Sequence, residues 1–107
     1  MKKLSLVLAM SLLIALLPGC QTAPATQVAA TTLPVYEFTT TLCQGTGITV
    51  TRLVTEEVSC LHDYTLQVTQ MRAVESADVV VVNGGGLEDF LGDVLASADR
   101  VIDASKD

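Results

Sequence analysis

Four consecutive valines, Val79–Val82, constrain the fold of this chain more than any other feature. Asp78 precedes the run, and Asn83 followed by three glycines ends it. A strand with one face in water alternates apolar and polar residues, whereas this run has no polar face. We therefore expect a central strand of a parallel sheet, covered on both sides.

Three further segments are typical of strands, because branched residues dominate them and turn residues or charges bound them. They are Val28 to Thr32, Ile48 to Val54, and Val101 to Asp103.

Two short helices are predicted before the valine strand. The first opens at Leu33-Pro34, because a proline in the first helical turn loses no hydrogen bond. The second runs from Thr69, as its N-cap, through Ser76. The residues expected to be buried are Val35, Phe38 and Leu42 in the first helix and Met71, Val74 and Ala77 in the second.

A third helix, after the glycines, has the most regular pattern. Its apolar residues recur at helical spacing and are Leu87, Phe90, Leu91, Val94, Leu95 and Ala98. The complete order is β-α-β-loop-α-β-α-β, which predicts an α/β fold built on a parallel sheet with flanking helices. Only four residues follow Asp103, so we expect the chain to be an incomplete lobe of a larger protein.

The N-terminus has the pattern of an export signal. Met1 to Lys3 is basic, and Leu4 to Leu17 is apolar but too short to span a bilayer as a stable helix. The next residues end in Cys20 and resemble a bacterial lipobox, in which the cysteine is lipidated and becomes the new N-terminus. We predict a signal peptide over 1–19, a tether over 20–27 and the lobe over 28–107. The alternative is an ordinary cleavage site with an incidental thiol.

These features predict a protein anchored by lipid to the cell membrane on its extracytoplasmic face, either periplasmic or on the cell surface. The net charge is −6, and it becomes more negative when Lys2 and Lys3 leave with the signal. Nucleic acid is therefore not an expected partner. An acidic surface is compatible with collecting cations, but it also serves solubility alone.

Two cysteines lie in the predicted lobe of the exported chain, Cys43 at the end of the first helix and Cys60 after the second strand. An oxidising compartment favours a disulfide between them, which would close a loop of roughly fifteen residues and contribute on the order of 3 kcal/mol. The rival interpretation is a metal site of Cys43, Cys60 and His62, although thiolates outside the cell tend to oxidise.

The glycine turn that begins at Asn83 also suggests an anion or nucleotide site, because free backbone N–H groups collect where a strand turns into a helix. The dinucleotide pattern fails, since Asp89 stands where its third glycine belongs and no phosphate-binding lysine is present. A tight turn at the carboxyl edge of the sheet explains the glycines more simply. No catalytic triad or carboxylate pair can be argued, so no enzyme is expected.

His62 is the only histidine, and Asp63 follows it. Neutral imidazole suits borderline metal ions, and an adjacent carboxylate can orient it. A lone histidine in a loop is otherwise an ordinary polar surface residue, because four ligands are the norm for zinc.

Four motifs in order resemble the zinc and manganese solute-binding lipoproteins of bacterial ABC importers, the ZnuA-like family. The matching residues are 28–36 (VAATTLPVY), 62–64 (HDY), 77–88 (ADVVVVNGGGLE) and 101–105 (VIDAS). The resemblance covers essentially the whole mature chain. The family usually has proline before the histidine and a Pro-Ser-Asp-like helix start, where this chain has Leu61 and Val68-Thr69-Gln70.

The resemblance implies two α/β lobes with a metal ion in the cleft between them, held by three histidines and a carboxylate. His62 matches the first of these ligands, in the N-terminal lobe, and the others would lie beyond Asp107. The implied function is capture of extracytoplasmic Zn²⁺ or Mn²⁺ and delivery to an importer permease, without catalysis. The alternatives are an adhesin-like surface lipoprotein of the same fold and a nucleotide- or anion-binding domain.

Overall fold

The chain forms one parallel sheet with helices on both faces in a computed structural model that describes residues 25–56 and 60–106. The strands are β1 (Gln27–Ala30), β2 (Thr49–Arg52), β3 (Val79–Val82) and β4 (Val101–Asp103). The helices are α2 (Leu33–Leu42), α3 (Val68–Ser76) and α4 (Gly92–Leu95), with two 3-10 turns, η1 (Leu61–Asp63) and η2 (Asp89–Leu91). The strand order is β2-β1-β3-β4, and all three pairs are parallel. The predicted α/β fold is therefore confirmed.

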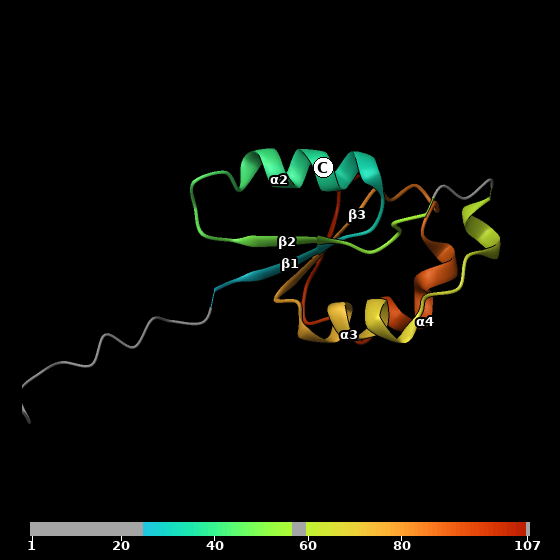
Figure 1. Ribbon diagram of the computed structural model, residues 1–107. Coiled ribbons are helices and arrows are strands. Elements are labelled where there is room, and N and C mark those ends of the chain that lie inside the picture. The colour runs from blue at the N-terminus through green and yellow to red at the C-terminus, as the bar shows by residue number, and fades with distance from the viewer. Residues whose placement is uncertain (1–24, 57–59, 107) are drawn as a thin grey trace, which may run out of the picture.

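Figure 1 shows α2 on one face of the sheet and α3 and α4 on the other. The valine run forms β3, which lies between β1 and β4. Val80 and Val82 are buried, and Val79 and Val81 are half-buried. The central position predicted for this strand is confirmed.

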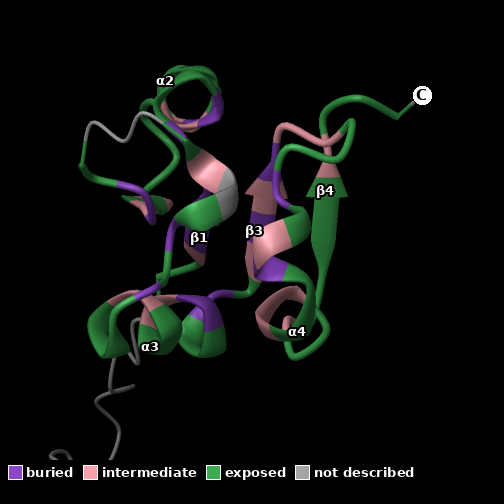
Figure 2. Ribbon diagram, turned by 90° about the vertical axis from the view of Figure 1, so that its right-hand side faces the viewer, coloured by how far each residue is buried: buried purple, intermediate pink, exposed green. Residues whose placement is uncertain are grey.

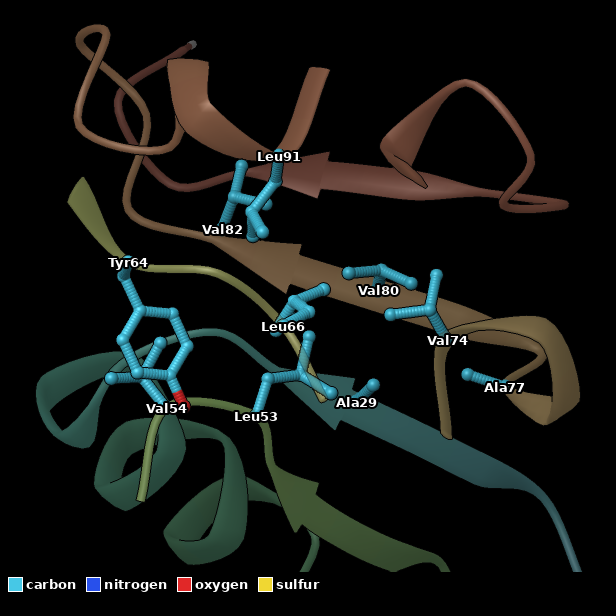
Figure 3. Packing of buried hydrophobic residues seen from close by; sticks show 10 residues of the cluster. All are labelled: Ala29, Leu53, Val54, Tyr64, Leu66, Val74, Ala77, Val80, Val82 and Leu91. Atoms are coloured by element: carbon cyan, nitrogen blue, oxygen red, sulfur yellow. The ribbon is translucent and has the colours of Figure 1, made fainter. Parts of the chain in front are cut away.

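The main hydrophobic core lies between the sheet and the α3 and α4 side of the molecule (Figure 3). Leu53, Val80 and Val74 are almost completely buried in it. The cluster comprises Ala29, Leu53, Val54, Tyr64, Leu66, Val74, Ala77, Val80, Val82 and Leu91. Burial of these side chains contributes roughly 25 cal/mol for each Å² of apolar surface removed from water.

Helix α2 begins at Leu33, with the predicted Pro34 in its first turn, but it turns a different face to the sheet than expected. Val35 and Thr39, four residues apart, are its buried side chains. Phe38 and Leu42 are 72% and 82% exposed, so the predicted burial of these two residues is wrong. A helix advances about 100° per residue, so burying Thr39 turns its neighbour Phe38 away from the sheet.

Helix α3 begins at Val68, with Gln67 as its N-cap in place of Thr69. The backbone N–H of Gln67 donates to Oε1 of Gln70 at 2.7 Å, which satisfies a group that a helix start leaves unpaired. Val74 and Ala77 are buried as predicted, whereas Met71 is 36% exposed.

The long third helix predicted from Leu87 to Ala98 is wrong. The segment forms the single turn η2 and the four-residue α4. Two local features shorten it. The side chain of Glu88 bonds back to the glycine turn, and Gly92 costs about 1 kcal/mol relative to alanine in a helix.

Strand β4 forms an edge of the sheet, and Val101 and Ile102 are 41% and 50% exposed (Figure 2). Across residues 25–56 and 60–106, the helices are all too short or too polar to cross a membrane.

Candidate metal site

His62 lies in η1, at the carboxyl edge of the sheet. Beyond β2, the N–H groups of Leu53 and Val54 still donate to the carbonyls of Ala30 and Thr31, each at 2.8 Å. The chain therefore runs along β1 to its end before it reaches η1. In open α/β sheets, ligands bind outside the carboxyl ends of the strands. The backbone position of His62 fits a ligand-binding residue.

The side chain of Gln70 fastens the His62 segment to the sheet. Its Nε2 donates to the carbonyl oxygen of Leu53 and to the hydroxyl oxygen of Tyr64, each at 2.7 Å. Its Oε1 accepts the N–H of Gln67, described above. One amide thus joins the end of β2, the end of η1 and the start of α3.

Tyr64 anchors η1 from its C-terminal side. Its side chain is only 9% exposed, and its N–H donates to the carbonyl of Leu61 at 3.1 Å. Its ring meets the ring of Phe90 edge to face, with centroids 6.0 Å apart and planes at 83°. Such aromatic pairs contribute about 1 kcal/mol beyond their buried area. This contact holds η1 against η2.

A hollow of about 430 Å³ lies beside η1. It is lined by Thr32, Leu33, Pro34, Arg52, Val54, Thr55, Glu56 and Leu61. Within the described ranges, no three His, Cys, Asp or Glu side chains are grouped so that they could hold a metal ion. The side chain of His62 lies outside the described part of the chain, so the rival site of Cys43, Cys60 and His62 stays an untested prediction.

The glycine turn after β3 binds a carboxylate of its own chain. Gly84, Gly85 and Gly86 all have positive φ, between 64° and 86°, a conformation that favours glycine. Oε1 of Glu88 accepts the N–H of Asn83 at 2.7 Å, and Oε2 accepts the N–H of Gly84 at 3.0 Å. The N–H of Gly85 donates to Oγ of Ser105 at 3.0 Å. These three donors of the turn are therefore used within the chain, which supports the tight-turn interpretation over a nucleotide site.

The same turn also touches the end of β4. A Cβ atom on Gly84 would overlap Oδ1 of Asp103 and Oγ of Ser105. Oδ1 accepts the hydroxyl and the N–H of Ser105 at 2.7 and 2.9 Å, and these two bonds lower the pKa of Asp103. Lys106 Nζ lies 3.4 Å from Oδ2 of the same carboxylate.

The structure does not bring Cys43 and Cys60 together. Cys43 caps the end of α2, before the parallel strand β2 begins, whereas Cys60 lies beyond the end of β2 as the N-cap of η1. Figure 1 shows the end of α2 and the end of β2 at opposite edges of the sheet. A disulfide needs Cα atoms about 4.4–6.8 Å apart. The predicted pairing does not fit this arrangement. Cys20, the predicted lipidation site, lies outside the described residues.

A scan against protein-family models matches residues 28–107 to the family described as ZnuA, zinc-uptake complex component A, periplasmic. The chain belongs to the ZnuA family. The match covers the proposed lobe from β1 through β4. A search of curated proteins gives no match.

Solved structures support the same fold for this ZnuA-family chain. The Zn(II)-bound ZnuA-like domain of AdcA from Streptococcus pneumoniae is 23% identical, with a TM-score of 0.62 over 78% of this chain and 32% of that chain. The Mn-bound periplasmic metal-binding protein of Candidatus Liberibacter asiaticus is 21% identical, with a TM-score of 0.63 over 73% and 30%. AdcAII from S. pneumoniae is 20% identical, with a TM-score of 0.60 over 79% and 33%. The chain spans about a third of the length of these structures.

Sequence reasoning missed Gln70, which fastens the His62 segment, and Glu88, which holds the glycine turn. Gln70 stands three residues after Gln67, the spacing of a capping box, which was an available signal. The helical spacing of Leu87, Phe90 and Leu91 places Glu88 in the first turn of the predicted third helix. Its bonds to residues far away in sequence, such as Thr31, had no local signal.

Proposed function

We propose that this chain is the part of an extracytoplasmic solute-binding protein that supplies the first ligand, His62, to a transported Zn²⁺ or Mn²⁺ ion. The observation that carries the proposal is the family match over residues 28–107, which includes the segment that contains His62. The position of η1 at the carboxyl edge supports it. The protein would pass the ion to an ABC importer permease and would catalyse no reaction.

Three further ligands would be needed, and none of them is assigned to this chain. Zinc prefers four ligands in a closed site, so His62 alone would bind the ion weakly. The choice of Zn²⁺ or Mn²⁺ as substrate rests on the similar structures, one Zn(II)-bound and one Mn-bound.

Calorimetric titration of the intact protein with Zn²⁺ and with Mn²⁺ tests the proposal. We expect one tight site for one of the two ions, and loss of at least about 100-fold in affinity on His62→Ala, because a ligand is removed. Asp99→Asn is the matched control, because Asp99 is an exposed residue between α4 and β4, away from η1. Equal affinity of His62→Ala and the unmodified protein would contradict the proposal.

We also propose that Cys20 carries the lipid anchor, because the residues before it resemble a lipobox. Detergent partitioning of the expressed protein tests this. Cys20→Ser is expected to move the protein from the detergent phase to the aqueous phase, and unchanged partitioning would contradict the anchor.

A further inference from the structure

Glu88 is an acid buried to 4% exposure, and four hydrogen bonds surround its carboxylate. Besides the N–H groups of Asn83 and Gly84, Oε1 accepts the hydroxyl of Thr31 at 2.7 Å and Nδ2 of Asn83 at 2.8 Å. All four donors are neutral, and Glu88 takes part in no ion pair within residues 25–56 and 60–106. Buried carboxylates are costly unless such donors compensate the lost water.

We propose that Glu88 is a positioning residue: its carboxylate fills an anion nest formed by Thr31, Asn83 and Gly84 and thereby fixes the carboxyl edge on which His62 lies. The nest joins two loops that are far apart in sequence. Thr31 follows β1, and Asn83 and Gly84 follow β3. The bonds are therefore tertiary contacts across the centre of the sheet.

Thr31 makes the nest part of the sheet itself. Its N–H donates to the carbonyl of Val81 at 3.0 Å, and its carbonyl accepts the N–H of Val54 at 2.8 Å. Asn83 adds a second bridge, because its Nδ2 also donates to Oγ1 of Thr32 at 2.6 Å. The carboxylate thus sits where the extensions of β1, β2 and β3 meet.

A short path of contacts leads from Glu88 to the His62 segment. The carbonyl of Glu88 accepts the N–H of Leu91 at 2.8 Å, which fixes η2. Phe90, within η2, packs its ring against Tyr64, and Tyr64 directly follows η1. Any effect of Glu88 on metal affinity rests on the function proposed above, whereas the nest itself does not.

Chemical rescue of Glu88→Ala tests the nest. Alanine keeps Cβ and removes the atoms of one acetate ion. We expect a clear fall in melting temperature that sodium acetate partly reverses by binding the folded state, while sodium chloride at equal ionic strength does not. Asp93→Ala removes an exposed acid of α4 and is the matched control, expected to show no acetate response.

Two results would overturn the nest. One is a Glu88→Ala protein that melts like the unmodified chain, and the other is an equal response to acetate and chloride. If this variant folds only in acetate, the proposal is supported, and failure to fold in both salts counts against it. Glu88→Gln keeps the shape of the side chain but turns an N–H of its amide toward the N–H of Gly84. Its melting temperature should therefore fall in part and should not respond to acetate.

Zinc titration of the same variants tests the positioning role. We expect Glu88→Ala to weaken zinc affinity about 10-fold, which is the size of effect seen when a contact behind a metal ligand is removed. In sodium acetate, the zinc affinity of this variant should return toward that of the unmodified protein measured in the same acetate solution. His62→Ala should lose affinity in both salts. Unchanged affinity of Glu88→Ala would remove the positioning role, whereas unchanged affinity of His62→Ala would refute the proposed function and leave the acetate result standing.

Discussion

Two segments at the carboxyl edge of the sheet are held in opposite ways. The turn from Asn83 to Glu88 is held by its own groups, because its backbone donors and its acid bond to each other and to Thr31. The η1 turn with His62 is held through residues that follow it, Tyr64 and Gln70.

This difference shows that the glycine turn is part of the scaffold, whereas the η1 turn is the proposed binding segment. The glycine turn looks like a ligand site in sequence, yet its donors serve the fold. The segment of His62 has a weak motif, yet the molecule anchors it at the edge where ligands bind in such sheets. A motif therefore indicates a ligand site only if its donors remain available after folding.

The largest effect is expected from Gly84→Ala, which attacks the scaffold turn. The new Cβ would overlap Asp103 and Ser105, and the positive φ of 80° adds backbone strain. Together these should destabilise the protein by about 3 kcal/mol, measured by denaturant unfolding. Gly85→Ala is the control, because its φ is also positive but nothing lies within 4 Å, so about 1 kcal/mol is expected. Equal losses would show that the close approach to β4 is unimportant.

A smaller effect is expected from Gln70→Ala, which loosens the His62 segment. The change removes bonds to Leu53, Tyr64 and Gln67, and we expect a loss of about 2 kcal/mol in unfolding free energy. Gln44→Ala is the matched control, since Gln44 is exposed and loses the same groups. If both variants unfold alike, Gln70 does not fasten η1 to the sheet.

Cys43→Ser should change stability by less than about 0.5 kcal/mol, because Cys43 and Cys60 lie at opposite edges of the sheet. A disulfide would instead make the loss on the order of 3 kcal/mol. Mass spectrometry of the unreduced protein gives a direct reading. A linked pair of peptides containing Cys43 and Cys60 would show that the predicted disulfide forms and that the two cysteines do not lie at opposite edges of the sheet.

The smallest effect concerns the pKa of Asp103, which the Ser105 hydroxyl and N–H lower. A lowered carboxyl pKa stabilises the fold above the pKa of the unfolded chain, and this contribution is lost as the pH falls through the folded pKa. Ser105→Ala should raise the pKa of Asp103 toward its ordinary value in an NMR titration. Ser97→Ala, whose hydroxyl bonds to Val94, should leave it unchanged. An unmoved pKa in Ser105→Ala would contradict the assigned cause.

The strands and their parallel pairing could be predicted because they depend on local pattern. The valine run has no polar face, and residues typical of turns bound each strand. The glycine turn could also be placed, because three successive glycines permit a positive φ that other residues rarely adopt.

The rest depended on contacts between distant residues. The spacing of the apolar residues from Leu87 to Ala98 indicates a helix. Glu88, however, bonds to Thr31, which is 57 residues away in the sequence, and this bond keeps the first residues of the segment out of a helix. The buried face of α2 likewise depends on its packing against the sheet, which buries Thr39 and leaves Phe38 exposed. For the metal site, the family resemblance pointed to His62, and the residues that anchor its segment became visible only in the fold.

NMR of the chain labelled with ¹⁵N tests the central claim most directly, because one histidine gives one set of imidazole signals. We predict that Zn²⁺ shifts the ring nitrogens of His62 in a saturable way, while neither Zn²⁺ nor phosphate moves the amide signals of Asn83 and Gly84. Ring signals of His62 that do not shift with Zn²⁺, or amide signals of Asn83 and Gly84 that shift with phosphate, would contradict the assignment of the two segments.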